Sequence, residues 1–227
     1  MTATASLVCL LAAAVPLLQL GWAQSYCSIS SCRSPRQHTM CRFTSSAVSS
    51  SCGSVRVSSV SAADRAEILR AHNDLRRAVQ RGDYSSSGLP PARAIGDLRW
   101  SSTLANIAQR WANQCVKGHD KCRNLLNGRY IGQNFAWSGN QNKDWKVRIA
   151  DRWFKKELRY VRSTLNGLKY RGGGAGHLTQ IIWAETTEVG CGYVETKRPT
   201  GRYVERFYFC NYGPGGNYFN RNVYEKL

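Results

Sequence analysis

Histidine is the residue type in this chain best suited to chemistry at neutral pH, and the 227 residues contain four of them. A neutral imidazole can ligate a metal ion or exchange a proton. His177 lies in the segment Gly176–Trp183, GHLTQIIW, behind the glycine-rich run 172–176. His119 follows Gly118 directly and precedes Asp120. We therefore take the surroundings of His177 as the centre of a candidate site.

The sequence contains few candidate residues for covalent catalysis. It contains no G-x-S-x-G nucleophile elbow, no H-E-x-x-H zinc motif and no recognisable Ser/His/Asp arrangement. A cysteine nucleophile would require a free thiol. Since the cysteines of the exported chain are expected to be paired, the motifs weigh against a hydrolase.

A short adhesion-type motif stands at Arg81-Gly82-Asp83. On an exposed loop this tripeptide can engage an integrin, with the carboxylate completing a metal shell and the guanidinium entering an acidic pocket. Here Gly82 has a sufficient structural role, because it follows a predicted helix and can end it in a left-handed conformation. We favour the structural explanation and keep integrin binding as the alternative.

The N-terminus and the cysteines indicate an extracellular protein. Residues 3–23 are almost wholly apolar or small, and they end in a small-x-small cleavage pattern at Ala23, so residues 1–23 are predicted to be a signal peptide. Pro16 and the short run disfavour a membrane anchor, and no later segment is long and apolar enough to span a bilayer. Of nine cysteines, Cys9 lies in the signal; the remaining eight predict four disulfides in a secreted chain.

The charge balance restricts the partners. The formal net charge is +18, and such a surface attracts glycosaminoglycans, acidic lipid surfaces or nucleic acid. Secretion makes the first two the expected partners, so nucleic acid is not predicted as one.

The first predicted elements are an arm and a long helix. Residues 24–60 are rich in Ser, hold four cysteines and lack the apolar residues for a core, so they predict a disulfide-stapled arm. Ser61 and Asp64 form a capping-box variant that begins a helix ending at Gly82. One face of this helix holds Ile68, His72, Leu75 and Val79. His72 is therefore predicted to be a hydrogen-bonded core imidazole.

Two further helices carry the residues on either side of the candidate site. The second begins at Ser101 or Ser102 and is expected to end at Gly118, with Cys115 on its buried stripe as the tether of the arm. The third spans about residues 143–161 and is strongly amphipathic. Its polar face carries a basic stripe of Arg148, Arg152, Lys155, Arg159 and Arg162. A solvated face is slightly favoured there over a heparan sulfate or acidic-lipid site.

The C-terminal part of the chain is predicted to be β-structure. Residues 189–195 and 202–210 are β-rich runs separated by a turn at 196–201, which is typical of a hairpin. Helices first and antiparallel strands late predict an α+β layered fold.

Taken in order, these motifs resemble the CAP superfamily, which includes cysteine-rich secretory proteins, arthropod antigen-five proteins and plant pathogenesis-related class-one proteins. The resemblance covers residues 61–227, the predicted CAP (SCP) domain. It rests on His72-Asn73-x-x-Arg76, Gly118-His119-Asp120, Gly132-Gln133-Asn134, Gly176-His177-x-Thr179-Gln180-x-x-Trp183, Val189-Gly190-Cys191-Gly192 and Cys210-Asn211-Tyr212-Gly213-Pro214-x-Gly216-Asn217. The arm resembles antigen-five proteins in Tyr26-Cys27, Cys32, His38-Thr39-x-Cys41 and Cys52-Gly53.

The resemblance implies structure and biology that spacing alone leaves open. It implies a three-layer α-β-α sandwich and, among the 105 pairings open to eight cysteines, the pairs Cys27–Cys41, Cys32–Cys122, Cys52–Cys115 and Cys191–Cys210. It also implies a venom or salivary origin and allergenicity.

The resemblance further implies a central cleft with two His and two Glu able to hold a divalent metal. By position the histidines are His119 and His177, but Gln133 replaces the first carboxylate. Counted without a gap, the second carboxylate position falls on Lys156; one inserted residue restores it as Glu157. The family tetrad is therefore broken. Weak Zn²⁺ or Cu²⁺ binding and purely structural hydrogen bonding stay open as alternatives, and no cofactor is required.

Three classes of function follow. The favoured one is a secreted, non-enzymatic binding protein that sequesters a small lipid-like molecule or another host-side effector. The second is an antagonist that binds integrin through Arg81-Gly82-Asp83, or heparan sulfate or acidic lipid through the basic stripe. A metal-dependent hydrolase is the least supported.

Overall fold

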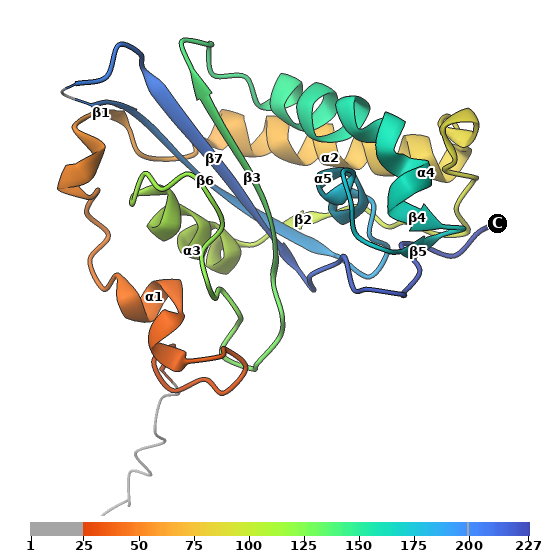
Figure 1. The fold of residues 1–227 in the computed structure, drawn as a ribbon, viewed down its shortest axis with the longest axis horizontal. Coiled ribbons are helices and arrows are strands. Elements are labelled where there is room, and N and C mark those ends of the chain that lie inside the picture. The colour runs from red at the N-terminus through yellow and green to blue at the C-terminus, as the bar shows by residue number, and fades with distance from the viewer. Residues whose placement is uncertain (1–24, 199) are drawn as a thin grey trace, which may run out of the picture.

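The computed structural model describes residues 25–227 except residue 199, so the predicted signal peptide lies outside the described residues. Within them a mainly antiparallel sheet lies between two helical layers (Figure 1). Helix α3 (Ser102–Ala112) covers one face of the sheet, and α2 (Ala62–Arg81) with the helical segment 145–164 covers the other. This α-β-α sandwich confirms the predicted fold class.

The centre of the sheet is a long hairpin of β6 (Glu188–Lys197) and β7 (Glu205–Gly213). These strands correspond to the predicted hairpin, and their residues are buried on both faces because helices cover both. β1 (Ser54–Val57) pairs with the outer side of β6, and β3 (Gly132–Gly139) pairs with the outer side of β7. β2 (Arg99–Trp100) runs parallel to β6. β3 has no counterpart among the predicted elements, yet it forms one wall of the site.

Helix α2 begins and ends where the sequence predicts. Ser61 caps it, with the reciprocal capping-box bonds to Asp64, and Gly82 ends it in the left-handed conformation. His72 is fully buried on the predicted face. Its Nδ1 donates to Ile68 O (2.8 Å) and its Nε2 accepts from the Tyr212 hydroxyl (2.8 Å). His72 is therefore a structural imidazole.

Helix α3 crosses the sheet at close range. Its buried stripe of Leu104, Ile107, Ala108 and Trp111 agrees with the prediction. A Cβ added to Gly190 would lie 2.3 Å from the backbone nitrogen of Ala105, so glycine is needed for this approach. The helix ends at Ala112 rather than at Gly118. Cys115 therefore lies beyond the helix, in a turn with φ of 53°, which corrects its predicted place on the stripe.

The predicted third helix is helical but not a regular α-helix. Its central part, η4 (Val147–Phe154), is π-helical, and η5 (Lys155–Tyr160) is a 3₁₀ helix that continues into α4 (Val161–Thr164). A π-turn accommodates an extra residue relative to an α-helix and rotates the residues that follow. A uniform 100° wheel still places Trp153, Phe154 and Val161 correctly on the buried face, but Tyr160, which it also places there, is 38% exposed.

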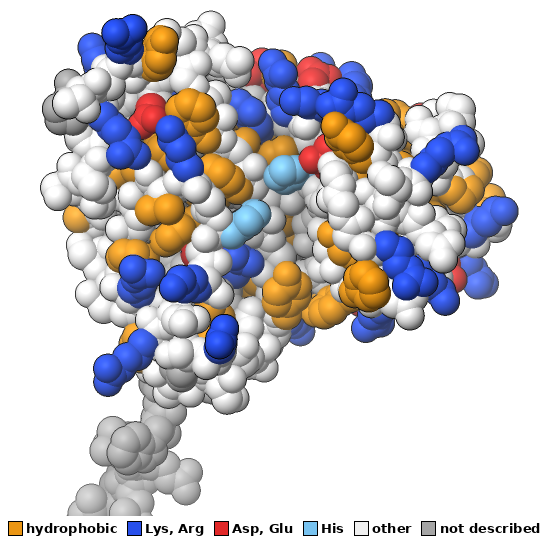
Figure 2. All heavy atoms as spheres, in the orientation of Figure 1, with side chains coloured by type: hydrophobic (Ala, Val, Ile, Leu, Met, Phe, Trp, Pro, Cys, Tyr) orange, Lys and Arg blue, Asp and Glu red, His pale blue; other side chains and the backbone are white. Residues whose placement is uncertain are grey.

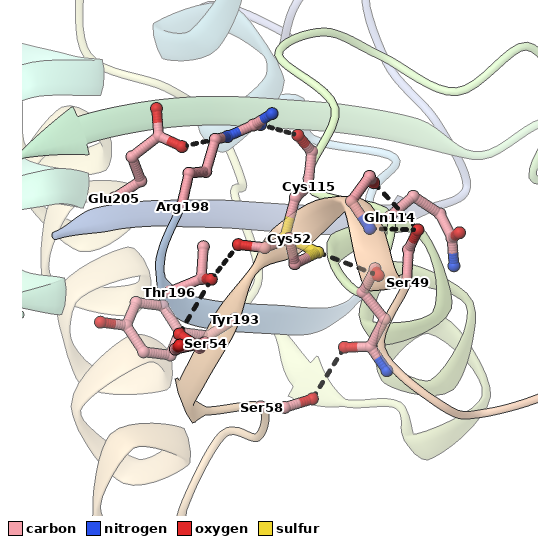
Figure 3. The surroundings of a disulfide bond; sticks show 12 residues. Ser49, Cys52, Ser54, Ser58, Gln114, Cys115, Tyr193, Thr196, Arg198 and Glu205 are labelled. Carbon is pink, nitrogen blue, oxygen red and sulfur yellow. Dashed lines mark hydrogen bonds and ion pairs between the residues drawn. A yellow bond between two sulfur atoms is a disulfide. The ribbon is translucent and has the colours of Figure 1, made fainter. Parts of the chain in front are cut away.

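The N-terminal arm is bonded to the body of the protein. The structure contains Cys27–Cys41, Cys32–Cys122, Cys52–Cys115 and Cys191–Cys210, as the family resemblance implies. Figure 3 shows Cys52–Cys115 beside Arg198, which donates to Cys115 O and to the Glu205 carboxylate. The arm also supplies β1 to the sheet, so the division at residues 60/61 separates regions of sequence that pair in space.

The remaining elements are short, and among the described residues no helix is long and apolar enough to cross a membrane. These elements are η1 (Pro35–Gln37), α1 (Thr39–Arg42), η2 (Ser50–Cys52), η3 (Ser85–Ser87), β4 (Leu165–Asn166), β5 (Lys169–Tyr170) and α5 (Gly176–Ile181).

Candidate functional site

The candidate site lies where α5, η5, β3 and the loop after α3 meet. Figure 2 shows histidine side chains in a hollow on one face of the molecule. Helix α5 carries His177, and it is held in place by Arg76 of α2, which is fully buried. The Arg76 guanidinium donates to four carbonyl oxygens, those of Gly96, Ile181, Trp183 and Thr186. The segment that follows His177 is thus fixed from the core.

His177 is held between two acceptors. Its Nδ1 lies 2.5 Å from Glu157 Oε1, and its Nε2 lies 3.2 Å from the carbonyl oxygen of Phe135. The other carboxylate oxygen of Glu157 accepts the backbone N–H of Leu178 (3.0 Å). The ring also stacks on Trp153 at 5.7 Å with an interplanar angle of 9°. With an oxygen acceptor at each nitrogen, both ring positions are used as donors when the imidazole is protonated.

His119 has an amide partner instead of a carboxylate. Gln133 donates through Nε2 to Asn211 Oδ1 (3.0 Å), so its Oε1 accepts from His119 Nδ1 (2.7 Å). Partial burial of the ring lowers the pKa of His119, and the nearby Arg123 and His177 act in the same direction. The neutral tautomer with Nε2 unprotonated is therefore the favoured form.

The structure places Glu157, rather than Lys156, on His177. Of the two positions that the sequence left open, Glu157 is thus the one whose carboxylate reaches His177. Glu157 is 8% exposed, whereas Lys156 is exposed. Both residues line the larger pocket, but only Glu157 bonds to His177.

The donor set does not fit a metal centre as it stands. Among the residues that the structure describes, no three His, Cys, Asp or Glu side chains lie close enough together to hold a metal ion. The Nε2 of His177 faces the carbonyl oxygen of Phe135 at 3.2 Å, and Gln133 is a weak ligand. Metal binding through His119, His177 and Glu157 remains a prediction.

Two adjoining pockets form one groove beside the histidines. The larger, about 660 Å³, lies between β3 and the segment η4–η5. The smaller, about 420 Å³, contains both His119 and His177. Glu157, Gly174 and His177 line both pockets. We call the two together the groove.

The walls of the larger pocket combine aromatic rings and cations. Strand β3 contributes the consecutive residues 135–139, including Phe135 and Trp137. The opposite wall contains Trp153 and Tyr160 together with a row of cations. We call this row the cationic wall; it consists of Arg148, Arg152, Lys156 and Arg159. Figure 2 shows Lys and Arg side chains gathered over this helical segment.

The predicted basic stripe is divided by the change of helix type. Arg148, Arg152 and Arg159 line the groove, joined by Lys156. Lys155 instead pairs with Asp151 at 3.0 Å, and Arg162 reaches Ser86 O at 3.5 Å. The adhesion-type tripeptide lies elsewhere, at the end of α2, where Arg81 pairs with Asp83 at 2.7 Å.

Three groove residues carry buried donors without a partner and were not predicted from the sequence as a group. Ser138 Oγ, Arg148 Nε and Trp153 Nε1 make no hydrogen bond to any described residue. Ser138 could not be found by sequence alone, because β3 lacks the turn signals and clear alternation that indicate a strand.

Comparisons with known proteins agree with the fold and the motifs. The model of the cysteine-rich secretory protein family, CAP, matches residues 69–212. The chain is 37% identical to venom allergen 5 of Brachyponera chinensis, covering 83% of this chain and 97% of the relative. It is 35% identical to venom allergen 5.02 of Dolichovespula maculata, covering 92% and 98%.

Solved structures support the same assignment. The crystal structure of NaASP2 with Zn²⁺ matches with a TM-score of 0.59 and 28% identity, covering 76% of this chain and 90% of that one. BmVAL-1 matches with a TM-score of 0.52 and 28% identity, covering 78% and 87%. With its sandwich fold, its four disulfides and these similarities, the chain belongs to the CAP family of cysteine-rich secretory proteins.

Proposed function

We propose that this protein is a secreted, non-catalytic binding protein that sequesters a small amphipathic ligand in the groove. The observation that carries the proposal is the pocket of about 660 Å³, lined by Phe135 and Trp137 of β3 and, on the opposite wall, by Trp153 and Tyr160. This volume is in the range of small-molecule sites, and such sites combine apolar walls with a few polar groups.

The surroundings of the histidines support binding rather than catalysis. A general base needs a group able to take a proton from a bound substrate. The partner of His119 is the amide of Gln133. Glu157 already accepts from His177 and from the Leu178 N–H. His119 is therefore oriented by a neutral amide instead of a carboxylate, and the one carboxylate that the described residues place in the cleft is committed to His177 and Leu178.

Metal-dependent activity has less support. NaASP2 is described with Zn²⁺, but in this chain Gln133 stands beside His119, and His177 has an oxygen atom near each ring nitrogen. Integrin binding is also less supported, because Arg81 and Asp83 are paired with each other. Binding of heparan sulfate or an acidic lipid surface remains the second candidate, favoured by the net charge of +18.

Native mass spectrometry of the secreted mature chain tests the proposal, with measurements before and after organic extraction and with a Zn²⁺ titration. We expect a bound mass that extraction removes. In parallel, the neutral fluorophore N-phenyl-1-naphthylamine should bind the extracted protein and be displaced by the extract. Tyr160→Ala should weaken this binding about tenfold through the loss of an aromatic wall.

The matched control is Phe219→Ala. Phe219 is 67% exposed and lines neither pocket of the groove, so this variant should bind the neutral fluorophore as the wild type does. A chain that carries no extractable mass and does not bind the fluorophore would contradict sequestration.

A further inference from the structure

We propose that the groove recognises the oxyanion of its ligand, so that the sequestered molecule is a small apolar or aromatic compound bearing a sulfonate, sulfate, phosphate-ester or carboxylate group. This inference rests on the proposed function and names the class of ligand. The feature that points to it is the cationic wall beside the aromatic residues.

The cations of the wall are not neutralised by the protein. The salt bridges among the described residues include none to Arg148, Arg152, Lys156 or Arg159. The carboxylate that lines the same pocket, Glu157, is already bonded to His177 and Leu178. The pocket therefore holds an excess of positive charge next to apolar surface, where charge–charge attraction is less screened than in bulk water.

Arg148 is the best-placed member of the wall. It is half-buried, and its guanidinium carbon lies 4.8 Å from the centre of the Tyr208 ring. Burial lowers the pKa of Arg148 without an acidic side chain bonded to it. A guanidinium fixed in this way offers a planar set of donors that matches carboxylate and phosphate oxygens.

The side of the wall nearest the sheet is fixed by buried polar groups. Ser138 and Arg148 both lie against the buried Tyr208 hydroxyl. Ser138 is 6% exposed. These contacts hold the Arg148 side chain from the side of the sheet, while Arg148 also lines the groove.

The test uses two fluorophores that differ in one charged group. 8-Anilinonaphthalene-1-sulfonate carries a sulfonate, and N-phenyl-1-naphthylamine is its neutral counterpart. We expect Arg148→Gln with Arg152→Gln to weaken binding of the sulfonate at least tenfold, because two charge-assisted contacts are lost. Binding of the neutral probe should change less than twofold.

The matched control removes the same charge from the same helical segment. Lys155→Gln with Arg162→Gln should leave both affinities unchanged, because neither side chain lines the groove. Should the Arg148 variant fold poorly, Lys156→Gln with Arg159→Gln tests the wall with exposed residues. If the groove variants lose affinity for both probes equally, or keep the wild-type affinity for the sulfonate, the oxyanion assignment is overturned while sequestration stands. Failure of the wild type to bind either probe would overturn both proposals.

A heparin column separates the small ligand from a polyanion. We compare Arg148→Gln with Arg152→Gln, the groove variant, against Lys155→Gln with Arg162→Gln, the control variant. If both variants elute at equally reduced salt, the heparin contact is spread over the surface. If only the groove variant elutes at lower salt and its affinity for the sulfonate is unchanged, a sulfated chain is the ligand of the wall and the small-molecule assignment is wrong.

Discussion

Gln133 shows how one side chain can change the chemistry of a cleft without altering its shape. Its amide bridges His119 and Asn211 and so fixes the orientation of the imidazole. A carboxylate at the same place would accept from His119 in the same way and would add a negative charge that raises ligand basicity. The residue at position 133 therefore decides whether His119 is only held in orientation or also has a negative charge beside it.

We predict that Gln133→Glu tightens Zn²⁺ binding by at least tenfold, because the new carboxylate orients His119 and adds a ligand charge. Isothermal titration calorimetry of the mature chain measures the change. Gln114→Glu is the control, since the Gln114 side chain bonds to Arg110 O and not to either histidine. If both variants bind Zn²⁺ like the wild type, His119 and His177 do not approach closely enough to share an ion.

A second prediction at this scale concerns acid. Burial lowers the pKa of His72 from 6.5 to about 4, with Arg76 acting in the same direction and the bond to Ile68 O opposing. The folded state thus binds fewer protons than the unfolded state, so stability is full above about pH 6.5 and falls as the pH drops toward 4. The loss from this residue is about 3 kcal/mol.

Urea unfolding at pH 7 and pH 4.5 measures this loss. His72→Gln should be less stable at pH 7 but should lose less stability between the two pH values than the wild type. The variant should still lose some stability in acid, because burial also lowers the pKa of His119. An identical pH dependence in both proteins would show that His72 does not contribute.

At the scale of elements, the segment 145–164 accounts for most of the difference between expectation and structure. Apolar periodicity correctly located α2 and the start of α3. β-rich composition located the hairpin, whose strands are buried on both faces and show no alternation. Within 145–164 the periodicity does not reveal the change from π to 3₁₀ helix. Nor does it show that Lys156 lines the groove and that Lys155 does not, or which residue bonds to His177.

The close crossing of α3 over the sheet gives the third prediction. Gly190→Ala should destabilise the protein by about 3 kcal/mol, because its Cβ would lie 2.3 Å from Ala105 N and 2.4 Å from Ser101 O. The matched control is Gly96→Ala, where nothing lies within 4 Å of the added Cβ. That change should be neutral or stabilising by about 0.5 kcal/mol. Thermal unfolding followed by circular dichroism compares them, and equal melting temperatures would refute the packing argument.

At the scale of the whole molecule, the disulfides hold the arm to the sandwich. Cys32–Cys122 closes a separation of 90 residues, whereas Cys27–Cys41 closes 14 within the arm. The Cys52–Cys115 bond lies inside the longer loop and shortens the stretch of chain that Cys32–Cys122 closes. Because the entropy removed from the unfolded chain grows slowly with loop length, loss of Cys32–Cys122 should cost slightly more than loss of Cys27–Cys41, which should cost about 3 kcal/mol.

We therefore expect Cys32→Ser with Cys122→Ser to lower the free energy of unfolding more than Cys27→Ser with Cys41→Ser. Guanidinium unfolding of the two double variants gives both values. The reverse order would indicate that local packing of the arm outweighs chain entropy. Neither change touches a residue of the groove, so affinity for the neutral fluorophore should persist in both.

The pairing of β1 with β6 has a consequence for any shortened form of the protein. A chain that began at residue 61 would lack β1 and would leave the outer side of β6, with its row of backbone donors and acceptors, open to solvent. Exposed sheet edges recruit strands from other molecules. A chain made without the arm would also leave the thiols of Cys115 and Cys122 without their partners. We therefore expect such a chain to associate with itself, through the open sheet edge and through new disulfides, whereas a proteolytic cut alone would leave the arm attached by these two bonds.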